Sequence, residues 1–170
     1  KSTYLLDKIN ISNENNEKIL VINHKIDTRY NKDKITNHNN ISIDCISFSK
    51  LNEIYDYNRT NSLCLGTLDH IYIDESQFFT DLEEVVSNLL NTYSNLKITC
   101  VGLDGDYQQN VFNNGQLLKL IAKAENVIKL SSKCYVCKKK AYFTKRTTTD
   151  KEQIVVGSNN IYVPSCYIHK

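Results

Sequence analysis

Short apolar runs along the chain predict the strands of one sheet. The clearest runs occupy residues 18–23, 70–73 and 97–101, where β-branched, aromatic and other apolar side chains predominate. Runs of this kind are typical of strands that are buried on both faces, as in a parallel sheet. Weaker runs at residues 41–46 and 126–130 predict two further short strands.

Stretches with helical spacing lie between these runs. The chain opens directly into one such stretch, and further helices are expected over residues 48–57, 81–93 and 115–123. Residues 31–40 are polar and rich in Asn, which predicts a loop. Strands that alternate with helices imply a parallel sheet with helices on its faces, so the expected fold class is α/β.

The stretch from residue 70 to residue 81 carries the most informative polar residues. Asp74 and Glu75 directly follow an apolar strand, and ligands of open α/β sheets lie beyond the carboxyl ends of the strands. Both acids can serve one crevice only if the chain leaves the sheet there, as Ser76 and Gln77 indicate. A strand that ends in Asp is typical of the Mg²⁺ site of P-loop proteins, and Glu75 would then be a general base. The alternative is a strand-to-helix turn in which Asp74 or Glu75 caps a helix.

The first three residues, Lys1-Ser2-Thr3, match the end of a Walker A motif, G-x-x-x-x-G-K-[ST]. The lysine would reach the β- and γ-phosphates, and the hydroxyl after it would bind Mg²⁺. Because the chain opens on Lys1 rather than Met, we expect upstream residues to supply a strand and the glycine-rich loop. The alternative is an ordinary exposed helix start.

Composition and charge narrow the class of protein only a little. The chain has 170 residues and a formal net charge of +2, which fits one domain with a small appendage and indicates no charged partner. No apolar run is long enough to cross a membrane and no signal peptide is visible, so we expect a cytoplasmic protein with no membrane partner.

The cysteines divide into two groups. Cys134 and Cys137 form a C-x-x-C pair, and Cys166 and His169 form a C-x-x-H pair near the end of the chain. Three thiolates and one imidazole predict a closed, structural zinc site, and the second pair argues against a redox role for the first. The remaining cysteines lie in or beside apolar runs and are expected to be structural: Cys45, Cys64 and Cys100.

These motifs together resemble those of the type II, cytosolic thymidine kinase family, over nearly the whole chain. Besides the two pairs of metal ligands, the matching motifs are Lys1-Ser2-Thr3, Asp27-Thr28-Arg29-Tyr30, Ile73-Asp74-Glu75-Ser76-Gln77-Phe78-Phe79, Leu103-Asp104-Gly105 and Phe143-Thr144-Lys145-Arg146. The resemblance implies a P-loop nucleotide-binding α/β domain over residues 1–130. It also implies a zinc-binding domain over residues 131–170, with a lasso loop that closes over thymidine.

The resemblance also implies an activity and a set of site residues. The expected reaction transfers the γ-phosphoryl group of ATP to the 5′-hydroxyl of thymidine, with Mg-ATP and a structural zinc ion as cofactors and Glu75 as the base. The positions that match the ATP and Mg²⁺ site are Lys1, Ser2, Thr3, Asp27, Thr28, Arg29, Asp74 and Gln77. The positions that match the thymidine site are Phe78, Leu103, Tyr107, Phe112, Thr144, Gln153, Ile154, Val155, Val156, Gly157 and Tyr162.

The family further implies a homo-oligomer, a tetramer, and feedback inhibition by dTTP, with no nucleic-acid partner.

One rival interpretation is a zinc-ribbon P-loop ATPase that acts on nucleic acid. Its support is a basic cluster: Lys133, Lys138, Lys139, Lys140, Lys145 and Arg146. Such a cluster is more often a solvated face. A catalytically inactive relative is a third interpretation, against which the adjacent Asp74 and Glu75 argue.

Overall fold

Four parallel strands form the central sheet of the protein. In the computed structural model, which describes residues 1–27, 34–36, 41–61, 63–149, 152–153 and 161–170, their order is β4-β1-β5-β6. The strands are β1 (Ile19–His24), β4 (Ile46–Phe48), β5 (His70–Ile73) and β6 (Lys97–Cys100). The predicted parallel sheet is therefore confirmed, and its three strongest strands lie within one residue of the expected bounds.

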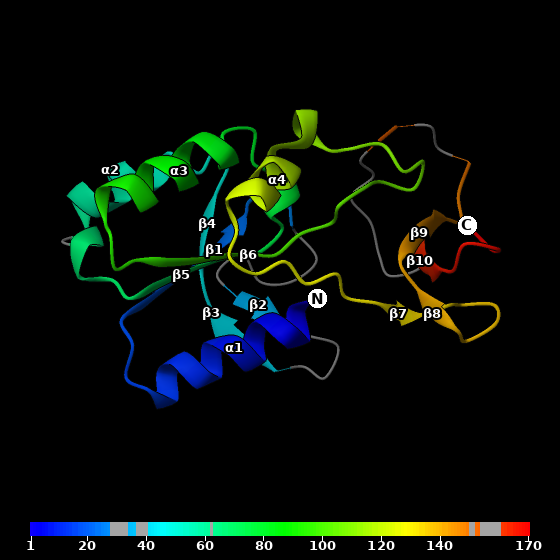
Figure 1. Cartoon of the computed structure of the whole chain (residues 1–170), viewed down its shortest axis with the longest axis horizontal. Coiled ribbons are helices and arrows are strands. Elements are labelled where there is room, and N and C mark those ends of the chain that lie inside the picture. Colours follow the sequence, from blue (N-terminus) through cyan, green and yellow to red (C-terminus); the bar gives the residue numbers. More distant parts are fainter. Residues whose placement is uncertain (28–33, 37–40, 62, 150–151, 154–160) are drawn as a thin grey trace.

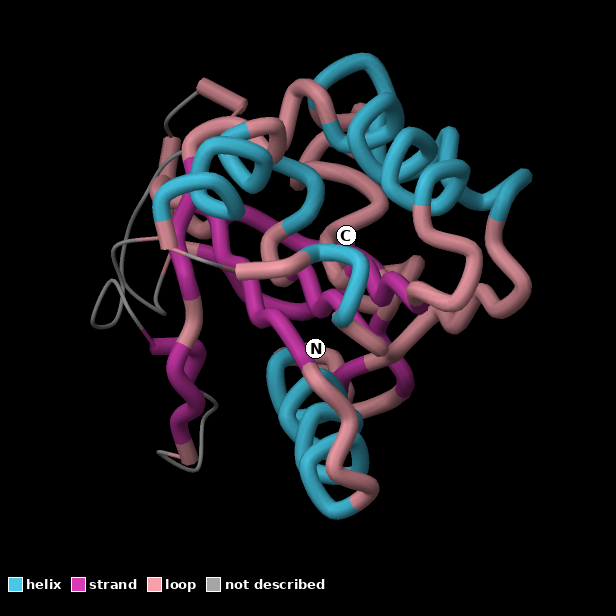
Figure 2. Tube along the Cα trace, turned by 90° about the vertical axis from the view of Figure 1, so that its left-hand side faces the viewer, coloured by secondary structure: helices cyan, strands magenta, loops and turns pink. Residues whose placement is uncertain are grey.

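Helices cover both faces of this sheet (Figures 1 and 2). Helix α1 (Ser2–Glu14) lies on one face, while α2 (Glu53–Thr60), α3 (Leu82–Thr92) and the short α4 (Gln116–Lys119) lie on the other. Side chains alternate along each strand, so Ile71 and Ile73 pack toward α3 while Tyr72 packs toward α1. Each fully buried aliphatic side chain contributes about 1.5–3 kcal/mol.

Helix α3 illustrates how sequence pattern becomes packing. Its buried residues are Leu82, Val85, Val86 and Leu89, the same apolar stripe that predicted the helix. Asp81, directly before it, accepts hydrogen bonds from the backbone N–H groups of Leu51 (2.9 Å) and Asn52 (2.9 Å). The start of α3 is thus tied to the chain just ahead of α2, which places both helices on the same face of the sheet.

The predicted elements between residues 31 and 57 differ from the structure in their bounds. Residues 41–46 form two strands rather than one, because β3 (Ser42–Asp44) pairs antiparallel with β2 (Lys34–Thr36) and β4 joins the main sheet. The predicted loop over residues 31–40 therefore contains a strand. The helix predicted from residue 48 begins at Glu53, because Phe48 belongs to β4.

The prediction of a strand over residues 126–130 is wrong. The segment forms no regular structure, and the side chains of Val127 and Ile128 are both 59% exposed. Its apolar residues suit a strand, but a strand needs a neighbour for its backbone N–H and C=O groups. Within the described residues, no strand pairs with it.

Short single-turn helices and two small hairpins complete the molecule. The 3₁₀ turns are η1 (Leu65–Thr67), η2 (Ser76–Phe78), η3 (Asn113–Gly115) and η4 (Leu120–Lys123). The hairpins pair β7 (Ser132–Lys133) with β8 (Lys140–Ala141), and β9 (Phe143–Arg146) with β10 (Tyr162–Ser165). They lie beside the sheet at the right of Figure 1, and we call residues 131–170 the hairpin unit. No described helix has both the length and the apolar character needed to cross a bilayer.

Candidate active site and metal site

The chain turns sharply out of the sheet after β5 and brings two carboxylates to one side. Glu75 adopts the left-handed conformation (φ 48°, ψ 35°), which is uncommon for a residue with a side chain and costs on the order of 1–3 kcal/mol. Asp74 and Glu75 are only 3% and 4% exposed, and both contact the ammonium group of Lys1. The expectation that the chain leaves the sheet here is confirmed. Glu75 stands at the N-cap position of η2, but its side chain makes no capping hydrogen bond there, and the Asp74 carboxylate accepts the N–H of Glu75 (2.8 Å).

Lys1 reaches these carboxylates from the start of α1. Its Nζ lies 2.7 Å from Glu75 Oε2 and 3.4 Å from Asp74 Oδ1. Leu5 and Ile9, which are fully buried against the sheet, hold the helix in this position. Burial raises the pKa of Asp74, while the Lys1 ammonium opposes this shift and the Glu75 carboxylate adds to it. Ser2 and Thr3 follow Lys1 in the first turn of the helix.

Gln77 contacts the same oxygen of the Glu75 carboxylate as Lys1 does. Its Nε2 donates to Glu75 Oε2 (2.7 Å), and its Oε1 accepts the backbone N–H of Leu103 (3.0 Å). Because an N–H group can only donate, the Leu103 contact fixes which end of the amide faces Glu75. Gly102 makes room for this arrangement, since a Cβ there would lie 2.6 Å from Gln77 Oε1.

Aromatic side chains pack around Phe78, the residue after Gln77. The ring of Phe78 packs edge-on against that of Phe112 at 5.7 Å and tilts against that of His24 at 5.8 Å. Asn113 ties the two segments together, because its Nδ2 donates to the carbonyl oxygens of Gln77 (3.0 Å) and Phe78 (2.8 Å). We did not predict this role, although the turn sequence Asn113-Asn114-Gly115 was visible.

His24 is a second residue whose role we did not predict. Its Nδ1 accepts the N–H of Ile26 (3.1 Å), which leaves Nε2 to donate to the carbonyl oxygen of Ser49 (3.1 Å). Burial lowers the pKa of His24, and both contacts suit the neutral ring. The ring also packs edge-on against Phe79 at 4.6 Å. His24 is therefore a supporting residue beneath the site and carries no charge at neutral pH.

The segment after β6, residues 103–112, connects the carboxylates with the hairpin unit. It begins at the Leu103 contact with Gln77 and ends at the Phe112 contact with Phe78. In between, Tyr107 stacks on the guanidinium of Arg146, which also contacts Tyr162. Gln153 Nε2 donates to Asp106 Oδ2 (2.9 Å). The structure thus places Tyr107, Tyr162 and Gln153 in one cluster.

The structure also places two further predicted residues. Thr144 lies in β9, opposite Pro164 of β10, and Asp27 lies half-buried just beyond β1. The predicted site positions Thr28, Arg29, Ile154, Val155, Val156 and Gly157 lie outside the described residues.

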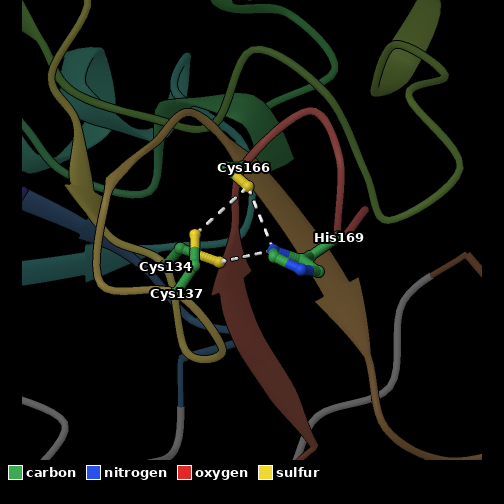
Figure 3. A group of neighbouring side chains, drawn as sticks. All are labelled: Cys134, Cys137, Cys166 and His169. Atoms are coloured by element: carbon green, nitrogen blue, oxygen red, sulfur yellow. Dashed lines mark hydrogen bonds between the residues drawn. The ribbon is translucent and has the colours of Figure 1, made fainter.

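The four predicted zinc ligands converge in the hairpin unit (Figure 3). Cys134 Sγ lies 3.6 Å from His169 Nδ1, Cys166 Sγ lies 3.2 Å from the same nitrogen, and the sulfur atoms of Cys137 and Cys166 are 3.7 Å apart. A tetrahedral zinc ion with Zn–S bonds of about 2.3 Å requires sulfur atoms about 3.8 Å apart. The ligand atoms therefore fit one zinc ion.

The electrostatics of this cluster also suit a metal. The backbone N–H group of Cys137, followed by those of Cys166 and Val136, lowers the pKa of the Cys134 thiol to about 5, so this sulfur is a thiolate at neutral pH. The N–H of Tyr135 donates to the carbonyl oxygen of Pro164 (2.9 Å), which joins the segments that carry the C-x-x-C and C-x-x-H pairs.

All six cysteines are described and free of disulfide bonds, but Cys64 is exposed rather than part of the core.

Comparison with known proteins identifies relatives along the whole chain. A family model described as thymidine kinase matches residues 1–169. Thymidine kinase a of Arabidopsis thaliana is 34% identical over 175 residues, which cover 99% of this chain and 69% of the plant protein. The thymidine kinase of Amsacta moorei entomopoxvirus is 35% identical, with 98% of this chain and 88% of the viral protein covered. That of Yaba monkey tumor virus is 36% identical, with 88% and 76% covered.

Proposed function

The chain belongs to the thymidine kinase family, and we propose that it transfers the γ-phosphoryl group of ATP to the 5′-hydroxyl of thymidine. The observation that carries the proposal is the pair of buried carboxylates at the end of β5, held beside Lys1 at the start of α1. Phosphoryl transfer needs this combination of a base, a metal ligand and a cation, because most of the acceleration comes from positioning and charge stabilisation.

Glu75 is the general base of the proposed mechanism. A 5′-hydroxyl is a poor nucleophile, so a positioned carboxylate must accept its proton as the bond to phosphorus forms. The amide of Gln77 and the ammonium of Lys1 both contact Glu75 Oε2, which sets the orientation of the carboxylate. The Glu75 carboxylate is thus oriented before the substrate binds, and efficient proton transfer requires such a fixed orientation.

Asp74 and the start of α1 bind the phosphates in this proposal. Asp74 offers a buried carboxylate oxygen, the donor that Mg²⁺ prefers, and bound Mg²⁺ would offset negative charge on the transferring phosphoryl group. Lys1 would contact the phosphate oxygens, and the first backbone N–H groups of α1 favour anions. Ser2, Thr3 and Asp27 complete the proposed ATP and Mg²⁺ site, together with Thr28 and Arg29.

We propose that thymidine binds between the segment after β6 and the hairpin unit. Phe78, Phe112, Tyr107 and Tyr162 offer aromatic surfaces for the base. Phe78 and Phe112 pack against each other, and Tyr107 and Tyr162 both contact the guanidinium of Arg146. Apolar contacts alone discriminate weakly between similar small substrates, so specificity also needs hydrogen bonds in a dry pocket. We propose that the segment from Gln153 to Gly157 supplies them.

The zinc ion has a structural role in this proposal. Cys134, Cys137, Cys166 and His169 would fill all four positions of a tetrahedral site and leave none for a substrate. The metal would fix the hairpin unit, including the two strands from which Thr144 and Tyr162 project. Residues 1–130 and 131–170 would then act as a nucleotide-binding domain and a zinc-binding domain.

Three further properties belong to the proposal on the strength of the family alone. They are assembly into a homotetramer, feedback inhibition by dTTP and a cytoplasmic location. Light scattering of the purified protein, a dTTP titration and cell fractionation test them separately. A monomer at working concentration would contradict the first property without affecting the proposed reaction.

Thymidine-dependent formation of ADP and of thymidine monophosphate tests the function. We expect both products in equal amounts when the protein is incubated with Mg-ATP and thymidine. The rival zinc-ribbon ATPase predicts ATP hydrolysis that is stimulated by DNA instead. Hydrolysis with DNA and none with thymidine would refute the kinase proposal.

A further inference from the structure

Arg146 is a buried cation at the junction between the two halves of the molecule. It ends β9 and is 8% exposed, although arginine is rarely buried without specific partners. In the sequence, Arg146 belongs to the motif Phe143-Thr144-Lys145-Arg146 and to the basic cluster. The other cations of that cluster are exposed, so Arg146 has a different environment from its neighbours.

The guanidinium group lies between two aromatic rings that come from different parts of the chain. Its carbon is 3.9 Å from the ring centre of Tyr107, in the segment after β6, and 5.0 Å from that of Tyr162, in β10. Contacts within about 6 Å of a ring face are attractive, and more so when the cation is desolvated. Arg146 Nη2 also donates to the hydroxyl of Tyr162.

The same guanidinium binds the backbone at Glu152 and Gln153. Nη1 donates to the carbonyl oxygen of Glu152 (2.6 Å) and Nη2 to that of Gln153 (3.2 Å). A planar fork with several donors can make these bonds while it stacks on a ring. Lysine carries the same charge, but its single ammonium cannot reproduce both the stacking and the divergent hydrogen bonds.

A second link runs parallel to the first. Gln153 Nε2 donates to Asp106 Oδ2 (2.9 Å) and to the carbonyl oxygen of Val111 (3.2 Å). The other oxygen of Asp106 accepts the N–H groups of Gln108 (2.8 Å) and Asn110 (2.9 Å), which fixes the turn that carries Tyr107. Gln153 is thus joined to the segment after β6 at Asp106 and at Val111, before and after Tyr107 in the chain.

We propose that Arg146 is a positioning residue that sets the affinity for the nucleoside. It fixes Tyr107 and Tyr162 relative to each other and anchors the backbone at Glu152 and Gln153, so that the pocket is formed before the substrate binds. This inference rests on the proposed function, because it assigns these tyrosines to the thymidine pocket. Arg146 contacts the proposed pocket residues and acts through them, so its loss should weaken substrate binding more than the chemical step.

Arg146→Met is the primary test, with thymidine and ATP kinetics measured on the zinc-loaded protein. We expect KM for thymidine to rise about 10–100-fold, the usual consequence of losing hydrogen bonds to a charged group. KM for ATP should change by less than about threefold, and kcat should fall by less than KM rises. Lys140→Met removes an exposed cation from the same unit and is the matched control, with unchanged kinetics expected.

Two further measurements separate positioning from general damage to the fold. In Arg146→Ala, methylguanidinium should lower KM for thymidine toward the wild-type value, whereas methylammonium should not. Hydrogen exchange should become faster at the amides of Gln108 and Asn110, which report the turn that carries Tyr107. If Arg146→Met loses its zinc, Arg146→Lys replaces it, with a rise in KM still expected.

An unchanged KM for thymidine in a zinc-loaded Arg146→Met or Arg146→Lys protein would overturn the inference. Equal rescue by methylammonium would also overturn it, because charge alone would then be sufficient. A wild-type protein that does not phosphorylate thymidine would refute the proposed function instead. In that case the exchange measurement still tests the link between Arg146 and the Tyr107 turn, since it needs no substrate.

Discussion

The carboxyl end of the sheet and the hairpin unit both hold predicted site residues, but they are stabilised in different ways. Below Asp74 and Glu75 lie Ile71 and Ile73, which are 0% exposed and belong to a core of many apolar side chains. The corresponding cluster of the hairpin unit consists of Cys134, Ala141 and Cys166, with Cys137 partly buried. Geometry at the first site therefore follows from packing, whereas we expect geometry at the second to depend on the metal ligands and on Arg146.

Removal of the metal should have the largest effect, and it should be confined to the hairpin unit. Cys137→Ser removes one ligand, and structural zinc contributes about 10–16 kcal/mol of apparent binding free energy in small zinc domains. We expect less than one zinc ion per chain, loss of the hairpin unit's protection from hydrogen exchange, and retained protection in β1 and β5. Cys64→Ser, at an exposed cysteine outside the cluster, is the control. A zinc-free protein with an unchanged melting temperature would contradict the proposed role.

At the sheet end, single side chains should matter for chemistry more than for folding. Glu75→Gln keeps the size of the side chain but cannot accept a proton at neutral pH, so kcat should fall by roughly 10²–10⁴-fold. Thymidine and ATP binding should remain close to wild type. Asp74→Asn should instead raise the Mg²⁺ concentration needed for activity. Wild-type kcat in Glu75→Gln would make Glu75 structural, and Asp27 or Asp104 would be the next candidates for the base.

Gly102→Ala tests whether packing around Gln77 fixes the orientation of the Glu75 carboxylate. The added Cβ would lie 2.6 Å from Gln77 Oε1 and 2.8 Å from Leu117 Cδ2, so both contacts must be relieved by movement. We expect a loss of about 1–3 kcal/mol in the free energy of unfolding, together with a lower kcat because Glu75 loses its fixed partner. Gly66→Ala is the control, since the nearest atom there is 3.4 Å away in the Tyr93 ring. Unfolding free energies and kcat equal to wild type would show that Gln77 is not held by Gly102.

The contrast between the two regions also explains what the sequence could predict. Strands β1, β5 and β6, helix α3 and the four metal ligands follow from patterns that are local in sequence, such as the apolar run over residues 70–73 and the two Cys and His pairs. Arg146, Asn113 and His24 act through contacts with segments far away in the chain, which no local pattern encodes. The wrong strand over residues 126–130 has the same cause, because its composition suits a strand and only the tertiary structure decides whether a partner is present.

The smallest effect is expected where the hairpin unit exposes apolar side chains. Ile168, between the ligands Cys166 and His169, is 79% exposed, so Ile168→Ala removes almost no buried surface. The free energy of unfolding should change by less than about 0.5 kcal/mol, with zinc retained. Leu89→Ala is the matched change in the sheet core, where the side chain is 1% exposed and the expected loss is about 2–5 kcal/mol. Chemical denaturation of both variants measures the difference directly. If Ile168→Ala were as destabilising as Leu89→Ala, apolar packing rather than the metal would hold the hairpin unit together, and the contrast between the two regions would not stand.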